Sequence, residues 1–399
     1  MTPRRALSFC LSALAFALPL SIAGTNVALA ALSGCLLWCL ASASARAVTA
    51  SALAREAREP MFLVLAAYAA WSLLSSAFGY DPAAGFRLFP KDAHKLWAFI
   101  TIAVALAASE RVFVAAPFAA GLAAHASYGI VQAIQQWSGG AYRVRAQGFL
   151  HPVSYGEVLG MGIIGAVAWY ARPREGAPPR ERTAAAALAA LTAAALVLSQ
   201  TRAVLLSLGV AFGAACLVET RWRRHVWAAL VVAAGVVAFW EVMPTGGRNL
   251  SNLLSQSAGT SAHRTRLVLW DVSLRAFAER PLAGVGPGQY RQAFERLHPQ
   301  RLDGVRSWGD AHNAYFHQLA ERGALGALLL VAALAALTRG AWRAEAARRD
   351  ARSLWAAGAT TAFLVMNLTE NAWQTEQVAT LVLFIWLLGA GTPPGREIL

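Results

Sequence analysis

Ala203-Val-Leu-Leu-Ser-Leu-Gly-Val-Ala-Phe-Gly-Ala-Ala-Cys-Leu-Val218 contains no charged residue, and Arg202 stands directly before it. Its apolar residues are continuous rather than spaced as on one face of an amphipathic helix. With its flanks, a helix of this length can cross the hydrocarbon core of a bilayer. The stretch therefore predicts a membrane-spanning helix, and comparable runs recur along the whole chain.

The composition agrees with this interpretation. Of 399 residues, 57% are hydrophobic and 14% are charged, and the mean hydropathy is +0.46. A water-soluble domain could not cover so much apolar surface, so the composition excludes that class.

We expect an all-α polytopic membrane protein with about twelve transmembrane helices and a large helical periplasmic loop between spans 9 and 10. The predicted division is 1–243 for spans 1–9, 244–312 for the loop, and 313–399 for spans 10–12 with a short cytoplasmic C-terminus. The spans are placed near 6–21, 25–43, 61–79, 94–108, 112–135, 154–171, 183–200, 203–219, 226–243, 313–337, 353–368 and 377–391.

Orientation follows from the distribution of basic residues. The chain has 35 Lys+Arg against 21 Asp+Glu, a net charge of +14. With a cytoplasmic N-terminus, the inside segments hold far more basic residues than the short outside loops, as the positive-inside rule requires. We therefore expect both termini to be cytoplasmic and the long basic loop to face outward.

The N-terminal segment has two interpretations. Arg4-Arg5, the apolar stretch and Ala28-Leu29-Ala30 have the features of a secretory signal with a cleavage site. A first membrane hairpin is favoured, because the many further spans already direct the chain to the membrane.

The loop 244–312 is far longer than a helical hairpin needs, and connections of this length are usually functional. Residues 265–277 and 289–297 are predicted helices, the first with Leu267, Trp270, Leu274 and Phe277 on one face. Gly284-Val-Gly-Pro-Gly288 is predicted to be a tight turn between them. A glycine-rich phosphate cradle is the alternative, but no strand precedes it.

Two arginine segments are candidates for anion binding. In Ser199-Gln-Thr-Arg202 a charge lies between two apolar runs, and in His263-Arg-Thr-Arg266 basic residues begin an amphipathic helix. Guanidinium groups just above the bilayer are suited to gripping a diphosphate. Snorkelling or headgroup anchoring are the alternatives, and they apply also to Arg87, Lys91 and Lys95 on an earlier external segment.

The third candidate segment begins Asp310-Ala-His-Asn313 and runs into an apolar span. Asp310 is expected as the helix N-cap, which would place His312 in the first turn. The positive helix end and nearby arginines would keep His312 neutral and able to accept a proton. The same segment contains Tyr315, His317 and Glu321, for which interior hydrogen bonding is the alternative to substrate binding. Zinc is the weaker alternative, because no HExxH is present.

In this order and topology, the segments resemble the O-antigen ligase and polymerase superfamily of bacterial envelope membrane proteins. The resemblance is carried by Thr201-Arg202, by Arg266-Leu-Val-Leu-Trp270 with Pro281-Leu-Ala-Gly-Val-Gly-Pro-Gly288, and by His312-Asn-Ala-Tyr-Phe with Glu321-Arg-Gly323. It is closest over 200–326. It implies an all-helical fold in the Gram-negative inner membrane, with the active site facing the periplasm.

The resemblance also implies the chemistry. Family members transfer glycans from undecaprenyl diphosphate without nucleotide or metal, so we expect no cofactor, no metal and no nucleic acid partner. The expected partners are the lipid-linked donor, a lipid A-core acceptor and membrane lipids. His312 is the expected catalytic base, and Arg202 and Arg266 are expected to bind the diphosphate. Further possible substrate-binding residues are Arg264, Asn313, Tyr315, His317 and Glu321.

Within the superfamily, O-antigen ligase is favoured over O-antigen polymerase by length and by the compact loop. Protein O-oligosaccharyltransferases usually carry extra C-terminal soluble sequence, so they come third. A lipid-linked glycan flippase would place ionisable residues at mid-membrane and often show inverted repeats. A structural scaffold would not explain the ordered Arg, Arg and His.

Overall fold

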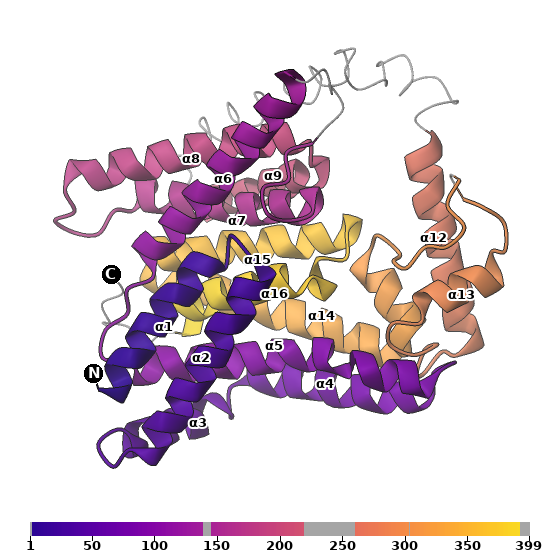
Figure 1. Cartoon of the computed structure of the whole chain (residues 1–399), viewed down its shortest axis with the longest axis horizontal. Coiled ribbons are helices and arrows are strands. Elements are labelled where there is room, and N and C mark those ends of the chain that lie inside the picture. Colours follow the sequence, from indigo (N-terminus) through magenta and orange to yellow (C-terminus); the bar gives the residue numbers. More distant parts are fainter. Residues whose placement is uncertain (1, 139–144, 219–259, 303, 392–399) are drawn as a thin grey trace.

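The computed structural model describes residues 2–138, 145–218, 260–302 and 304–391, and in these ranges the chain is helical without a β-sheet. Figure 1 shows a bundle of long helices with a smaller helical unit at one end. The helices are α1 Pro3–Ala17, α2 Ile22–Ala41, α3 Arg46–Glu56, α4 Pro60–Ala77, α5 Pro82–Ala108, α6 Ala115–Ser138, α7 Pro152–Ala171, α8 Pro179–Ser199, α9 Arg202–Val218, α12 Thr260–Glu279, α13 Tyr290–Leu297, α14 Ala314–Arg348, α15 Ala351–Thr369, η3 Ala372–Gln374, α16 Glu376–Trp386 and η4 Leu387–Gly391.

Proline marks the start of several of these helices. Pro3, Pro60, Pro82, Pro152 and Pro179 each occupy the first helical position. A proline there loses no hydrogen bond, because the first amides of a helix have no partner within it, and its fixed φ suits the helix. The hairpin connections are therefore encoded locally.

The predicted spans coincide with helices wherever the structure describes them. Among the residues that the structure describes, four helices are long and apolar enough to cross a membrane, namely α2, α4, α8 and α14. The apolar helices α9 and α16 with η4 are shorter. The predicted span at 226–243 lies outside the described residues. The chain is a multi-pass helical membrane protein, and the count of twelve spans stays a prediction.

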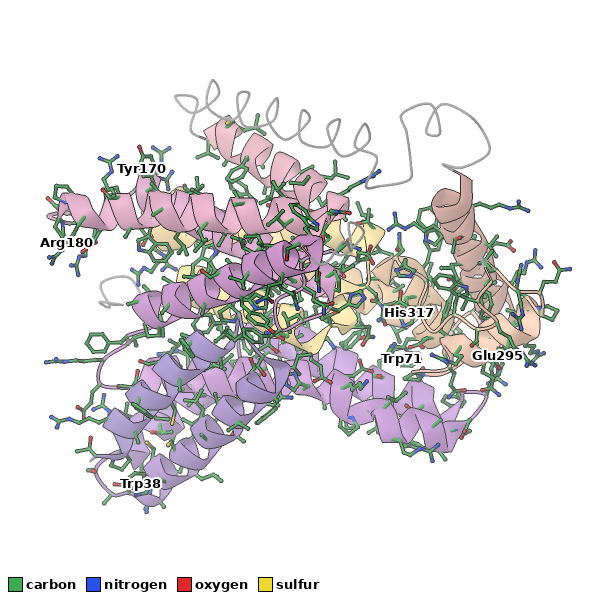
Figure 2. The ribbon with its side chains drawn as sticks, turned by 45° about the horizontal axis from the view of Figure 1, so that its top comes forward. Trp38, Trp71, Tyr170, Arg180, Glu295 and His317 are labelled. Carbon is green, nitrogen blue, oxygen red and sulfur yellow. The ribbon has the colours of Figure 1, made fainter. Side chains whose placement is uncertain are left out.

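Successive long helices run in opposite directions, so their connections gather at two ends of the bundle (Figure 1). Tyr170 and Arg180, which flank the α7–α8 connection, lie at one end, and Glu295 of α13 lies at the other (Figure 2). The last turns of α14 reach the first end, because Arg172 pairs with Glu345 at 2.6 Å. The α7–α8 connection and the last turns of α14, predicted to be cytoplasmic, thus share one end, and α13, predicted to be external, lies at the other.

The helices α15 and α16 lie in the core of the bundle. Every residue of α16 from Gln377 to Trp386 is buried, and so is most of α15. A helix that is apolar on all sides is stable only inside a bundle or in lipid, and here neighbouring helices cover it. The Trp386 indole N–H reaches the carbonyl of Leu337 at 2.9 Å, which ties α16 to α14.

The two helices predicted in the loop are present as α12 and α13, with a core of their own. The buried side of α12 differs from the one expected. Leu267 and Leu274 are 61% and 48% exposed, whereas Leu269, Val272 and Ala276 are buried against α13. Of the predicted positions, Trp270 does pack against this core, and its ring stacks on Phe316 of α14 with the ring centroids 5.2 Å apart.

The turn predicted at 284–288 is confirmed as a turn. Gly284, Gly286 and Gly288 all have positive φ. The amides of Val285 and Gly286 donate to the carbonyls of Ala320 and Glu321, both at 2.9 Å. These two amides therefore hold α14 and do not face a phosphate.

α14 is broken at Gly323, whose φ of 65° lies in the left-handed region. A Cβ there would come within 2.2 Å of the carbonyl oxygen of Leu282. Ala324 donates its amide to the carbonyl of Pro281 at 2.8 Å. The turn of the loop thus fits into the break, and only glycine allows this close approach.

Candidate active site

One carboxylate joins two of the residues predicted to act in the site. Glu370, which follows the last turn of α15, has one oxygen 3.1 Å from Nη2 of Arg266 and the other 3.1 Å from Nδ1 of His312. Its own side chain is 15% exposed, whereas those of His312 and Arg266 are 37% and 34% exposed. The guanidinium of Arg266 and the imidazole of His312 are therefore more exposed to solvent than the carboxylate that they share.

The backbone around His312 is held in an uncommon conformation. His312 has φ of 47°, a left-handed value that is costly for a residue with a side chain. Its amide donates to Oδ1 of Asp310, and Asn371 donates to Oδ2 of Asp310 at 2.9 Å. The segment before α14 and the segment after α15 together impose this geometry, which directs the imidazole to Glu370.

Asn313, not the expected Asp310, caps α14. Its side-chain oxygen accepts from the amides of Tyr315 and Phe316 at 3.0 and 3.1 Å. Its amide group donates to the carbonyl of Leu368 at 2.8 Å. Asp310 is too far before the helix to cap it because His312 interrupts the helical conformation, so His312 lies before the first turn.

Arg202 and Arg145 form the neighbouring part of the site. Arg202 is the first residue of α9 and directly follows Thr201, which comes after the left-handed Gln200. Arg145 donates to the carbonyl of Ser199 at 2.7 Å and to the hydroxyl of Thr201 at 2.9 Å. Burial lowers the pKa of Arg145, and Glu370 and Arg202 are close enough to raise and lower it respectively. Arg145 thus lies near both Arg202 and the carboxylate that contacts Arg266.

The electrostatics of His312 differ from the expectation. The hydrogen bond that His312 donates to Glu370 raises the pKa of His312, and Asp310 contributes in the same direction, whereas burial and Arg266 oppose it. The predicted neutral imidazole rested on a helix terminus that His312 does not occupy. A carboxylate in direct contact outweighs more distant positive charge. His312 is therefore a stronger base than an isolated histidine.

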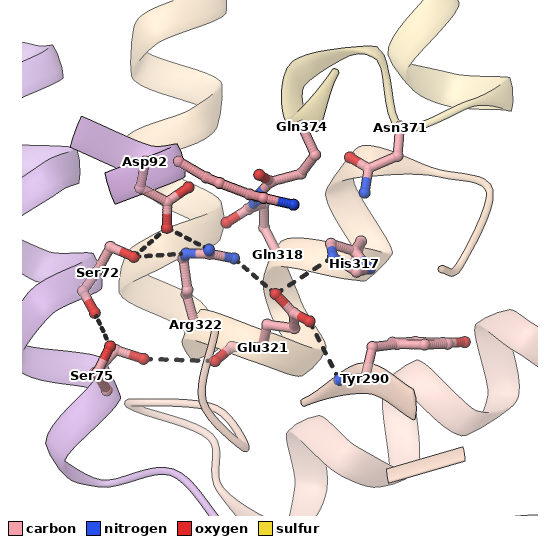
Figure 3. Close-up of polar contacts among 12 residues, drawn as sticks. Ser72, Ser75, Asp92, Tyr290, His317, Gln318, Glu321, Arg322, Asn371 and Gln374 are labelled. Carbon is pink, nitrogen blue, oxygen red and sulfur yellow. Dashed lines mark hydrogen bonds and ion pairs between the residues drawn. The ribbon is translucent and has the colours of Figure 1, made fainter. Parts of the chain in front are cut away.

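His317 and Glu321 lie inside the protein, apart from the partly exposed side chains of Arg266 and His312. Both side chains are buried in the first turns of α14, with Nε2 of His317 3.3 Å from Glu321. Glu321 also accepts from Nη1 of Arg322 at 3.0 Å and from the amide of Tyr290 at 3.1 Å (Figure 3). Tyr315, whose hydroxyl reaches the carbonyl of Leu364 at 3.3 Å, likewise makes an internal contact.

Residues 187–331 match the family model described as O-antigen ligase. This segment belongs to the O-antigen ligase family. Arg202, Arg266 and His312 all fall within it. A search of curated proteins finds none that matches the chain. Members of the family are glycosyltransferase-like membrane enzymes that act on lipid-linked glycans.

Within the O-antigen ligase segment, Arg264 lies exposed on α12, two residues before Arg266. The site also contains residues outside the segment that the sequence analysis did not predict, namely Arg145 and Glu370. Both lie in predicted external connections next to apolar spans, and an acidic residue in a short external connection opposite His312 was a usable signal.

Lys95 also differs from the expectation of an interfacial anchor. Its side chain is 1% exposed, with Nζ 3.8 Å from the carboxylate of Asp92 and 5.4 Å from the centre of the Trp373 ring. A buried ammonium requires such partners. The sequence placed Lys95 at the edge of a span, whereas α5 begins earlier and carries it into the bundle.

No group of three or more His, Cys, Asp or Glu side chains suited to a metal ion occurs in the described ranges. The carboxylate at the centre of the site is bonded to a guanidinium and an imidazole. The arrangement therefore offers an anion-binding surface with a base beside it.

Proposed function

We propose that the protein is an O-antigen ligase, which transfers O-antigen polysaccharide from undecaprenyl diphosphate to a sugar hydroxyl of lipid A-core in the periplasm. The observation that carries the proposal is the bonding of Glu370 to both Arg266 and His312, with Arg145 and Arg202 close by. Cations for a diphosphate and a base for a hydroxyl then lie on either side of one carboxylate.

The arginines would hold the donor. As the bond between sugar and phosphate breaks, negative charge grows on the diphosphate oxygen that leaves. Arg266 and Arg202 can stabilise that charge with charge-assisted hydrogen bonds. Glu370 keeps Arg266 ordered at 3.1 Å before the donor arrives.

His312 would accept the proton of the acceptor hydroxyl. The contact of Nδ1 with Glu370 assigns the ring proton to Nδ1 and leaves Nε2 as the base. The acceptor oxygen bonds to the anomeric carbon and inverts it, and its proton moves to Nε2. The electron pair of the broken bond remains on undecaprenyl diphosphate, so no nucleotide is consumed.

The other candidate residues divide by exposure. Arg264 is exposed on the same helix as Arg266 and is suited to the phosphates of lipid A-core. The remaining candidates already make hydrogen bonds or ion pairs within the protein. They would therefore support the residues that bind substrate and would not contact it themselves; they are Asn313, Tyr315, His317 and Glu321.

The proposed setting is the inner membrane of a Gram-negative bacterium, with twelve spans, residues 244–312 in the periplasm and both termini in the cytoplasm. The position of α12 and α13, which lie in the predicted external loop, at the end of the bundle that carries the site supports this orientation (Figure 1).

Gene deletion followed by gel analysis of lipopolysaccharide tests the proposal. Loss of a ligase leaves bare lipid A-core and accumulated lipid-linked polymer. Loss of a polymerase, the second member of the superfamily to consider, leaves core that carries a single repeat. Complementation with the wild-type chain restores the ladder, whereas a His312→Ala chain expressed at the same level does not. An unchanged ladder after deletion would contradict both assignments.

A further inference from the structure

Asp92 of α5 is a buried carboxylate that the proposed chemistry does not use. Its Oδ2 accepts from the hydroxyl of Ser72 and from Nη2 of Arg322, and its side chain is 1% exposed (Figure 3). Removing a charge from water inside a membrane bundle is costly unless a partner compensates it. The contacts of Asp92 supply such a partner and indicate what the carboxylate does.

Arg322 contacts Glu321 as well as Asp92. Its Nη1 donates to Glu321 at 3.0 Å, and its Nε donates to Ser72 at 3.1 Å. Arg322 thus holds two carboxylates at once, one from α5 and one from its own helix. The network fixes α14 against α4 and α5 immediately before the break at Gly323.

Glu321 connects the network to the helices of the loop. It accepts from the amide of Tyr290, the first residue of α13, at 3.1 Å. The hydroxyl of Tyr290 donates to the carbonyl of Leu269 in α12 at 2.7 Å. Arg266 lies one turn before Leu269 on the same helix, and its guanidinium reaches Glu370. The contacts are therefore continuous from α5 to the proposed site.

We propose that Asp92 is a positioning residue for the transfer site, which sets where α12 holds Arg266 relative to His312. This inference rests on the proposed function. Asp92 touches neither substrate nor reacting atoms, and it acts through Arg322 and Glu321. Breaking the first link frees α13, and α12 with it, to move Arg266 relative to His312 by more than transfer tolerates.

Kinetics of the purified full-length Asp92→Asn protein in nanodiscs test the proposal, with lipid-linked O-antigen as donor and lipid A-core as acceptor. Misplacement of a group by about 1 Å can cost about 100-fold in rate, so kcat should fall by that order. The KM for the donor should change by less than about threefold, because Arg202 is attached to other helices. An unchanged kcat would overturn the proposal.

A double-mutant cycle separates positioning from general damage. If Asp92 acts through Arg266, then Asp92→Asn should slow the Arg266→Ala protein by no more than about twofold, because coupled residues are not additive. Glu345→Gln is the matched control, since Glu345 forms a buried ion pair with Arg172 at the opposite end of α14. It should leave kcat near wild type. Multiplicative losses in the Asp92 and Arg266 pair would overturn the proposal.

Hydrogen–deuterium exchange gives a readout that does not depend on transfer. Asp92→Asn should speed the exchange of α12 and α13 amides, and Glu345→Gln should not. Should Asp92→Asn fail to fold, Ser72→Ala removes one hydroxyl from the same network and should cause a smaller change in the same direction. Wild-type protein without transfer activity would count against the proposed function. Active wild-type protein, with exchange unchanged in Asp92→Asn and Ser72→Ala, would count against the positioning role alone.

Discussion

At the scale of single residues, Glu370 connects two segments of the proposed site, because its carboxylate contacts two side chains. It holds the guanidinium of Arg266 on one oxygen and the imidazole of His312 on the other. A phosphate could replace Glu370 as the partner of Arg266. The contact between Glu370 and His312 would then still keep the ring proton on Nδ1. The same carboxylate therefore orders the proposed site in the absence of substrate and orients the proposed base.

Replacing His312 by alanine should reduce transfer by about 10²- to 10⁴-fold, the usual contribution of a general base. Binding of the lipid-linked donor should remain, because the arginines are untouched. Single-turnover transfer and donor binding, measured on the same reconstituted protein, check this. Near-normal transfer by His312→Ala would show that another group takes the proton.

Replacing Glu370 by glutamine should move the pH dependence of transfer. The base must be neutral, so the rate rises as pH increases through the pKa of His312. Glu370 raises that pKa, with Asp310 adding to the effect and Arg266 opposing it. Loss of the carboxylate lowers the pKa, and the acidic limb of the kcat profile should shift to lower pH while the maximum falls. A limb that stays in place would separate Glu370 from the base.

At the scale of elements, the break in α14 is where the O-antigen ligase segment departs from a simple hairpin. The turn that begins at Pro281 bonds to Ala320, Glu321 and Ala324 on both sides of Gly323. The loop helices are consequently attached to a spanning helix through backbone hydrogen bonds. This attachment explains why Glu321-Arg-Gly323 and the glycine turn occur together in the sequence.

Gly323→Ala should destabilise the protein by about 1–3 kcal/mol through its left-handed φ, and more where the added Cβ displaces the turn. The Cβ would lie 2.2 Å from the carbonyl oxygen of Leu282. Thermal unfolding in detergent measures the effect. Gly213→Ala in α9 is the control, because nothing lies within 4 Å of its added Cβ. Equal melting temperatures for the two variants would contradict the strained break.

On the scale of the whole molecule, the alternating helices collect one set of connections around the site and the other set at the far end (Figure 1). Arg145, Arg202, His312 and Glu370 come from four separate connections. The proposed place of transfer therefore lies between the loop unit and the bundle and is not a property of the loop alone.

Cysteine accessibility should confirm the orientation. In spheroplasts, a cysteine at Val305, which is 42% exposed, should react with a membrane-impermeant thiol reagent. A cysteine at Arg174, in the connection between α7 and α8, should react only after lysis. The wild-type chain, with its four native cysteines in helices, gives the background. The reverse pattern would invert the proposed topology.

The sequence by itself determined the long apolar helices that the structure describes, most of their boundaries, the two loop helices and the glycine turn. These depend on local properties, namely runs of apolar residues, prolines at helix starts and helical periodicity. Spacing and family resemblance also selected Arg202, Arg266 and His312. Only the tertiary structure decided that Glu370 pairs with His312, 58 positions away, and with Arg266, 104 positions away. The same is true of Asp92 and Arg322, 230 positions apart. Such ion pairs depend on which helix ends pack together, and no local periodicity carries that information.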